Sequence, residues 1–438
     1  MSVKNIYSEL NQSQLTEEKQ RLTAKYNEFK AKNLKLNMTR GIPCKEQLDL
    51  SNDMLDIDLS EINYTAKEMG DFRNYCSPLG VMGIFEAREL FRELIGADNT
   101  NEIMVGGNSS LNIMYNMIAN SMLFGVHDKA TPWSKLEKNQ KAKFLCPVPG
   151  YDRHFAICEY LDIEMINIKM NSDGPDMDEV EKYVNTDPAV KGIWCVPKYS
   201  NPDGLTYSDE VVKRLANLSP AADDFRIYYD NAYIIHDLNE KGDELLNIFA
   251  ELKKNNKEDM IYIFASTSKI TFCGAGISAI CASEKNIKYI SSKVFVQMIC
   301  PDKINQMRHV LFLKDKAGIK AHMDKHRKIL KPKFDAVING LEKNLGGTGL
   351  ALWKNPNGGY FISLFVSENC AKRTVELAAN AGVALTPAGA TYPYKKDPSD
   401  SNIRIAPTFP TINDLELAVD ALCVCVKLAY IEKEKTNK

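Results

Sequence analysis

Short apolar runs alternate with polar turns and helical stretches through the middle of the chain. The runs are three to six residues long, and helical patterns lie between several of them. Such alternation favours an α/β domain. Runs that are apolar almost throughout are typical of parallel strands, which are buried on both faces. The pattern therefore predicts a largely parallel sheet, with strands at 103–105, 144–148, 163–168, 193–196, 227–229, 262–265 and 277–281.

The two ends of the chain follow a different pattern. Residues 1 to about 35 are polar, with an amphipathic helix predicted at 15–30 and an extended segment at 34–41. Beyond about residue 284, helical stretches continue to about residue 345. The rest predicts a strand at 359–365, a further helix, an extended run around 403–406 and a final amphipathic helix from residue 412. We interpret this part as a second, smaller α+β unit.

Length and composition indicate a globular protein with more than one domain. The 438 residues favour two or three units, because a domain usually has roughly 100–200 residues. The net charge of -2, without a long run of one sign, argues against nucleic acid as a partner. No run approaches the roughly 20 apolar residues of a membrane span, and the N-terminus lacks the apolar core of a signal peptide. The 11 cysteines lack C-x-x-C spacing, so we expect reduced thiols in a cytoplasmic protein.

Candidate chemistry begins with Lys269, which follows the apolar run at 261–265 and three small hydroxylated residues. A lysine held neutral in a closed site can form a Schiff base with an aldehyde cofactor. By itself, a lysine after a strand is usually solvated. Asp230 and Tyr233 follow another strand, at 227–229. The acid could keep a pyridine nitrogen protonated, and the phenol could bind a ring hydroxyl. With Lys269, they indicate a pyridoxal phosphate site.

Three other strand ends carry groups that could bind the same cofactor. The turn at 106–110 (Gly-Gly-Asn-Ser-Ser) opens a helix whose free amides favour an anion such as phosphate, although a plain helix cap explains it too. Asn201 lies in an Asn-Pro-Asp-Gly turn, where its amide could bind the ring hydroxyl or only form the loop. Tyr151 could stack on a flat ring, and His154 could support Asp230 from behind.

Metal and hydrolase sites are not predicted. His322 and His326 have the four-residue spacing of two metal ligands on one helix face, but the glutamate of a zinc protease does not follow His322. Their stretch is highly charged, so we expect both on a solvated helix face. No G-x-S-x-G sequence surrounds a serine.

In this order, the segments resemble the fold-type I pyridoxal-phosphate-dependent aminotransferases, from about Arg40 to Arg404. The shared order is phosphate turn, aromatic residue, Asn-Pro-x-Gly, Asp-x-x-Tyr, Ser-x-Ser-Lys and a late arginine. The segments at 36–41 (Leu-Asn-Met-Thr-Arg-Gly) and at 266–271 (Ser-Thr-Ser-Lys-Ile-Thr) are similar to the corresponding segments of a bacterial aspartate aminotransferase subgroup.

The resemblance implies a fold and a division into domains. The implied fold is α/β, of the pyridoxal-phosphate-dependent transferase type I, with a mostly parallel seven-stranded central sheet in a large domain and a smaller α+β domain. We expect residues 1–50 to form an N-terminal segment of the small domain. Residues 51–310 would then form the large cofactor-binding domain, and 311–438 the small C-terminal domain.

The resemblance also implies how the cofactor is held. Lys269 would form the Schiff base, Asp230 would meet the pyridinium nitrogen, and Asn201 and Tyr233 would bind the ring oxygen. The other residues assigned to the cofactor are Asn108, Ser109, Ser110, Ser266 and Ser268 near the phosphate, and Tyr151 stacked on the ring. One departure concerns Ile277, because many relatives carry a phosphate-binding arginine eight residues after the lysine. Another cation would have to replace it, or amides and hydroxyls would hold the phosphate alone.

Two arginines and a tyrosine are implied to contact substrate and a partner subunit. Arg404 matches the arginine that grips the substrate α-carboxylate, a task suited to a bidentate guanidinium. Arg40, beside Gly41 and near Asn201, is the candidate for a distal carboxylate; alternatively it forms a structural salt bridge. Tyr75 matches a tyrosine that reaches the phosphate of the partner subunit, which implies a homodimer with shared active sites.

The predicted function is transfer of the amino group from L-aspartate, or a similar amino acid, to 2-oxoglutarate. The partners would be amino acids and 2-oxo acids. Alternatives are a pyridoxal-phosphate-dependent β-lyase, an aminotransferase for another amino acid, a non-catalytic ligand sensor with this fold, and a plain scaffold protein. The sensor is less favoured, because such proteins carry a DNA-binding domain ahead of the fold and the segment before Arg40 is short.

Overall fold

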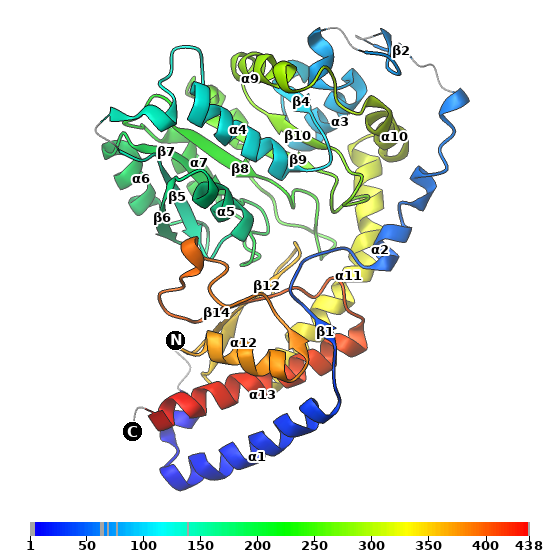
Figure 1. The fold of residues 1–438 in the computed structure, drawn as a ribbon. Coiled ribbons are helices and arrows are strands. Elements are labelled where there is room, and N and C mark those ends of the chain that lie inside the picture. Colours follow the sequence, from blue (N-terminus) through cyan, green and yellow to red (C-terminus); the bar gives the residue numbers. More distant parts are fainter. Residues whose placement is uncertain (1–4, 62–64, 68–69, 76–77, 138–139, 437–438) are drawn as a thin grey trace.

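The computed structural model describes residues 5–61, 65–67, 70–75, 78–137 and 140–436. Figure 1 shows a large body built on one sheet and a smaller body with a short sheet and long helices. Helix α1 (Gln12–Ala31) lies along the C-terminal helix α13 (Ile412–Thr436) in the smaller body. No helix in the described ranges combines the length and apolarity that a membrane crossing needs.

Within the described residues, the main sheet has seven strands in the order β4-β10-β9-β8-β7-β5-β6. β10 runs antiparallel to its neighbours β4 and β9, and the remaining neighbours are parallel. The strands are β4 (Ile103–Val105), β5 (Lys143–Val148), β6 (Glu164–Lys169), β7 (Val190–Cys195), β8 (Arg226–Asp230), β9 (Ile261–Ser266) and β10 (Ser278–Cys281). Each of the seven apolar runs forms one strand, which confirms the predicted sheet.

Strand β7 begins three residues before the apolar run that predicted it. Lys191 is buried there and donates a hydrogen bond to the Asp224 carboxylate at 2.5 Å. A Cβ atom on Gly192 would lie 2.4 Å from Cζ of Phe144, so the aromatic ring packs directly on the strand backbone. A lysine and a glycine do not look like strand residues in a sequence, and only these contacts explain the longer strand.

Both faces of the main sheet are buried, because successive strand residues point to opposite sides. In β8, Ile227 and Tyr229 pack into one core and Tyr228 packs into the other. The first core is completed by α3 (Phe85–Ile95), α6 (Met177–Thr186), α7 (Asp209–Asn217), α8 (Ile248–Lys254) and α10 (Lys303–Leu313). The second is completed by α4 (Ser110–Phe124), α5 (Asp152–Tyr160) and α9 (Glu284–Gln297). This two-sided burial explains the nearly continuous apolar runs.

The smaller body has its own core. Its antiparallel sheet has the order β11-β12-β14, and β1 pairs parallel with β13. The elements are β1 (Leu36–Asn37), β11 (Ala351–Trp353), β12 (Ile362–Val366), α12 (Ala371–Asn380), β13 (Val383–Ala384) and β14 (Asn402–Ile405), with α1 and α13. The short elements α2 (Lys45–Asp49), β2 (Thr65–Ala66) and β3 (Gly70–Asp71) lie between β1 and the main sheet in the sequence.

Helix α11 (Lys316–Leu345) connects the two bodies. Ile319 and Met323, near its start, pack in the core of the large body, and Leu330 and later residues pack in the core of the smaller one. One continuous helix therefore couples the two cores. The boundaries 1–50, 51–310 and 311–438 stay a prediction.

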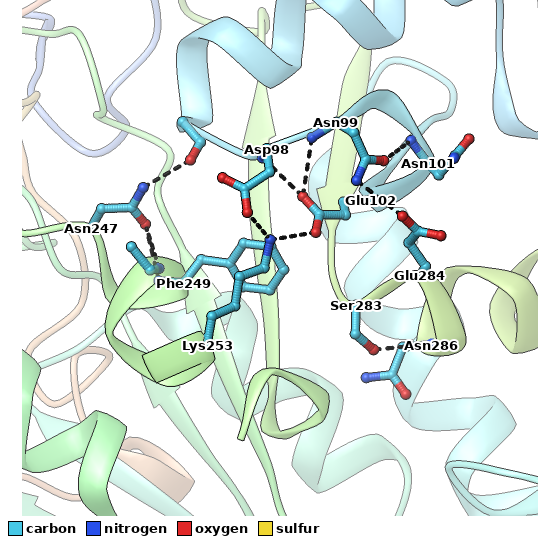
Figure 2. A network of polar contacts seen from close by, with 12 residues as sticks. Asp98, Asn99, Asn101, Glu102, Asn247, Phe249, Lys253, Ser283, Glu284 and Asn286 are labelled. Carbon is cyan, nitrogen blue, oxygen red and sulfur yellow. Dashed lines mark hydrogen bonds and ion pairs between the residues drawn. The ribbon is translucent and has the colours of Figure 1, made fainter. Parts of the chain in front are cut away.

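A polar network fixes the loop that leads into β4 (Figure 2). The buried carboxylate of Glu102 accepts hydrogen bonds from the Lys253 ammonium of α8 and from the backbone N–H of Asp98. Asn247 caps the start of α8 and also donates to the carbonyl of Gly96 at 2.8 Å. Because buried polar groups must find partners, the network favours this one loop conformation. β4 then ends at the predicted phosphate turn.

Candidate active site

A cavity of about 830 Å³ lies between the carboxyl ends of the parallel strands and the smaller body. Ligands of open α/β sheets bind at such strand ends. Thirteen of the fourteen predicted site residues line it: Arg40, Gly41, Asn108, Ser109, Ser110, Tyr151, Asn201, Asp230, Tyr233, Ser266, Ser268, Lys269 and Arg404. Tyr75 does not, and its side chain is 75% exposed. The fold therefore brings together residues from five strand ends and from the smaller body, and their individual roles stay a prediction.

Asp230, the last residue of β8, is a buried acid with one free oxygen. His154 Nε2 lies 3.0 Å from Asp230 Oδ2, and the His154 ring stacks on Trp194 with centroids 4.1 Å apart. His154 therefore supports the carboxylate from behind, as expected. Asp230 Oδ1 has no hydrogen-bond partner in the described chain. A buried oxygen without a partner is costly, so it is suited to a ligand that brings an N–H group.

Lys269 follows β9 in the sequence and lines the same cavity. Its Nζ lies 5.1 Å from the centroid of the Tyr233 ring and 5.9 Å from that of Tyr360. Burial lowers the pKa of Lys269, and the nearby Asp230 and Cys273 oppose that shift only in part. A lowered pKa enlarges the neutral fraction of the amine, which is the form that acts as nucleophile and base.

The predicted phosphate turn is anchored to neighbouring strands by two hydroxyl groups. Ser268 Oγ donates to the carbonyl of Asn108 at 2.8 Å, and Ser278 Oγ donates to that of Gly107 at 2.7 Å. Ser109 is the N-cap of α4, but its side chain makes no capping hydrogen bond. A free hydroxyl beside the amides at a helix start suits an anion. Ile277 is buried in the first core of the large body and cannot face this anion.

Arg404, on β14, is a buried cation. Its Nη1 donates to Asp152 Oδ1 at 2.8 Å and to Asn201 Oδ1 at 3.3 Å, and its Nη2 donates to Thr386 Oγ1 at 3.3 Å. The guanidinium also lies 4.8 Å from the centroid of the Phe361 ring. Sequence reasoning missed three of these neighbours. An acid directly after Tyr151 could have been noticed, whereas Thr386 and Phe361 carry no local signal.

Arg40 and Gly41 reach the cavity from the N-terminal segment. Arg40 is exposed and forms no ion pair with a described residue, so the alternative of a structural salt bridge has no support. A Cβ atom on Gly41 would lie 2.6 Å from Cζ of Phe361, the ring that packs against Arg404. Glycine at this position therefore allows close approach of the segment to the arginine.

The prediction of a solvated face for His322 and His326 is wrong. Both are buried, because the helical period of α11 places them on the same face as Ile319, Met323 and Leu330. The charged neighbours face outward instead. In the described chain, no cluster of three or more His, Cys, Asp or Glu side chains could hold a metal.

These histidines belong to a hydrogen-bond network beneath Lys269 that the sequence did not predict. His322 Nε2 lies 2.9 Å from the carbonyl of Ile270 and 3.1 Å from His326 Nε2. Gln47, on α2, lies 3.1 Å from His326 Nδ1 and donates to the Tyr360 hydroxyl at 2.9 Å. The network joins the N-terminal segment, the smaller body and the lysine loop.

Acid should destabilise the protein through these histidines. Burial lowers the pKa of His322, and it lowers that of His326 to about 3. The unfolded chain binds protons near the usual histidine pKa of about 6.5, so stability is full above that pH and falls as the pH drops towards about 3. His326→Gln should make this dependence shallower by up to about 1.4 kcal/mol per pH unit.

Urea unfolding between about pH 4 and 7 measures this dependence, since the slope reports proton uptake on unfolding. His127→Gln, in a turn after α4, is the control and should keep the wild-type slope. Equal slopes for wild type and His326→Gln would contradict the assignment.

Comparison with known proteins identifies the family. The aspartate amino-transferase family pattern matches residues 10–438. The chain is 43% identical over 408 residues to the aspartate aminotransferase of Corynebacterium glutamicum, covering 93% of this chain and 92% of that protein. The crystal structure of an aspartate transaminase from that species matches with a TM-score of 0.93 and 41% identity, covering 99% of this chain and 100% of that one.

A more distant structure has the same fold. LysN, the α-aminoadipate aminotransferase of Thermus thermophilus, was solved in complex with N-(5'-phosphopyridoxyl)-L-leucine. It matches with a TM-score of 0.71 at 18% identity, covering 91% of this chain and 94% of that one. These matches confirm the predicted transferase fold of type I. The chain belongs to the aspartate amino-transferase family, and it is an aminotransferase.

Proposed function

We propose that this aminotransferase uses pyridoxal phosphate, attached through Lys269, to move the amino group of L-aspartate to 2-oxoglutarate. The observation that carries the proposal is one cavity that holds both an amine with a lowered pKa, Lys269, and a buried carboxylate with a free oxygen, Asp230. Relatives named aspartate aminotransferases support the choice of amino donor.

The residues present fit this cofactor. The free Oδ1 of Asp230 suits a protonated ring nitrogen, and Tyr151 contributes an aromatic face beside His154. Asn201 and Tyr233 are buried polar groups in the cavity wall that suit the ring oxygen. The start of α4 suits the phosphate. Its amides and hydroxyls would take the place of the phosphate-binding arginine that many relatives carry at the position of Ile277. In the bound state, the cofactor supplies an aldehyde and an electron-accepting ring.

Three residues would then perform the chemistry on the amino acid. Arg404 orients the α-carboxylate. The neutral Lys269 Nζ takes the proton from the substrate α-carbon and holds it during the transfer. Asp230 keeps its partner nitrogen protonated, which stabilises negative charge that develops at that carbon.

Arg40 is proposed to bind the distal carboxylate of aspartate and 2-oxoglutarate. It is an exposed, unpaired cation in the described cavity wall. Arg40→Gln should lower kcat/KM for L-aspartate by about 10–100-fold, the value of one charged hydrogen bond, and change that for L-alanine by less than about threefold. Lys35→Gln, in the same segment but outside the cavity, is the control. Equal losses for both amino acids would remove Arg40 from this role.

The reaction itself is tested by incubating the purified protein with L-aspartate and 2-oxoglutarate and following oxaloacetate. Product from another amino acid, but none from aspartate, would change the substrate and keep the transfer. Release of ammonia in the absence of any oxo acid would favour a β-lyase instead.

We further propose a homodimer in which Tyr75 of each subunit reaches the phosphate site of the other subunit. Besides Tyr75, exposed apolar side chains gather at the end of α4, where Leu123 and Phe124 lie, and on α9, where Phe295 and Val296 lie. Exposed apolar side chains of this size suit a protein interface. Sedimentation equilibrium tests the dimer.

The ten free cysteines of the described chain are consistent with a cytoplasmic location.

A further inference from the structure

We propose that Asp152 determines how tightly the site binds its substrates, because its carboxylate occupies the position on Arg404 that a substrate carboxylate must take. The inference rests on the proposed function of Arg404. It adds a residue whose ion pair is exchanged each time an amino acid or oxo acid binds.

The contact has the geometry of a strong ion pair. Arg404 Nη1 donates to Asp152 Oδ1 at 2.8 Å, in the range of charge-assisted hydrogen bonds. The side chain of Arg404 is 6% exposed, and that of Asp152 is 32% exposed. The other hydrogen-bond partners of the guanidinium in the described chain, Asn201 and Thr386, are neutral. The pair joins β14 of the smaller body to the start of α5.

The guanidinium already has partners on both of its terminal nitrogens. Its Nε is buried and has no hydrogen-bond partner in the described chain. A carboxylate that binds two parallel N–H groups at the end of the guanidinium has to meet Nη1 and Nη2 together. Nη1 already donates to Asp152 and to Asn201, and Nη2 donates to Thr386.

A substrate carboxylate and Asp152 therefore compete. Nη1 carries two N–H groups and already has two acceptors, and a second anion beside Asp152 is repelled by it. The incoming carboxylate therefore displaces Asp152, which is the more exposed member of the pair. This exchange weakens binding of every substrate that carries an α-carboxylate, by the same factor in ground state and transition state. Such an effect appears in KM much more than in kcat.

Asp152→Asn tests the competition. The Kd of succinate, measured by calorimetry on the purified holoenzyme and on cofactor-free protein, should fall about threefold to tenfold, the range expected for a partly exposed ion pair. KM for L-aspartate and for 2-oxoglutarate should fall by a similar factor. The control is Asp209→Asn, because Asp209 is the first residue of α7 as Asp152 is of α5, and it is exposed outside the cavity.

A second variant separates failure of this inference from failure of the proposed function. Arg404→Lys keeps a positive charge but loses the planar fork. If it weakens succinate binding while Asp152→Asn leaves the Kd unchanged or raises it, the competition is wrong and the role of Arg404 stands. If Arg404→Lys binds succinate as wild type does, the proposed function of Arg404 is wrong. Far-ultraviolet circular dichroism and thermal unfolding show that each variant is folded.

Discussion

Lys269→Ala should lower kcat by at least about 10⁴-fold, the upper end of what a general acid–base group contributes. The variant loses both the amine that would attach the cofactor and the base that would take the α-proton. Burial lowers the pKa of Lys269, so the native amine is available in its neutral form. Steady-state assays with L-aspartate and 2-oxoglutarate measure the loss.

The matched control is Lys395→Ala, because Lys395 is a second lysine in the wall of the same cavity. It should keep kcat within about threefold, as expected of a side chain that only lines the site. Lys269→Arg adds a further test, since it keeps the charge but cannot become neutral near pH 7. Full turnover in Lys269→Ala would remove the proposed mechanism.

Asp230→Asn should lower kcat by about 10²–10³-fold, the usual effect of removing one group that stabilises charge in the transition state. A neutral amide cannot hold a ring nitrogen protonated, although it retains the shape of the carboxylate and can still contact His154 Nε2. Asp230 also raises the pKa of Lys269. The variant should therefore lower that pKa further, because a neighbouring negative charge no longer favours the ammonium form.

The second effect is measurable on cofactor-free protein, as the pH dependence of reductive methylation of Lys269. Asp237→Asn is the control, because Asp237 pairs with Lys198 and Tyr199 and does not line the cavity. Activity near the wild-type level in Asp230→Asn would contradict the charge argument. An unchanged pKa of Lys269 would show that the two groups do not interact.

The regular part of the fold could be predicted because its signals are local. Apolar runs bounded by turns identified all seven strands of the main sheet, and helical periodicity identified α1, α11 and α13. Site residues such as Asp230 and Lys269 lie at the end of those strands or within three residues after it. Since parallel strands bring their carboxyl ends to one edge, adjacency in the sequence predicted adjacency in the cavity.

Local patterns failed where a long-range contact decides the environment. His322 and His326 looked solvated because charged residues surround them, yet the face they share with Ile319 packs against the lysine loop. The start of β7 likewise depends on the partner of Lys191.

By itself, the sequence determined the α/β class, the positions of the seven strands along the chain and the site residues that lie at the ends of those strands. All of these follow from residues that are neighbours along the chain. Only the tertiary structure decided that Arg404 meets Asp152, a residue 252 positions away, and that Gln47 contacts His326 across 279 positions. Such pairs have no period or spacing, because they depend on how the smaller body packs against the large one.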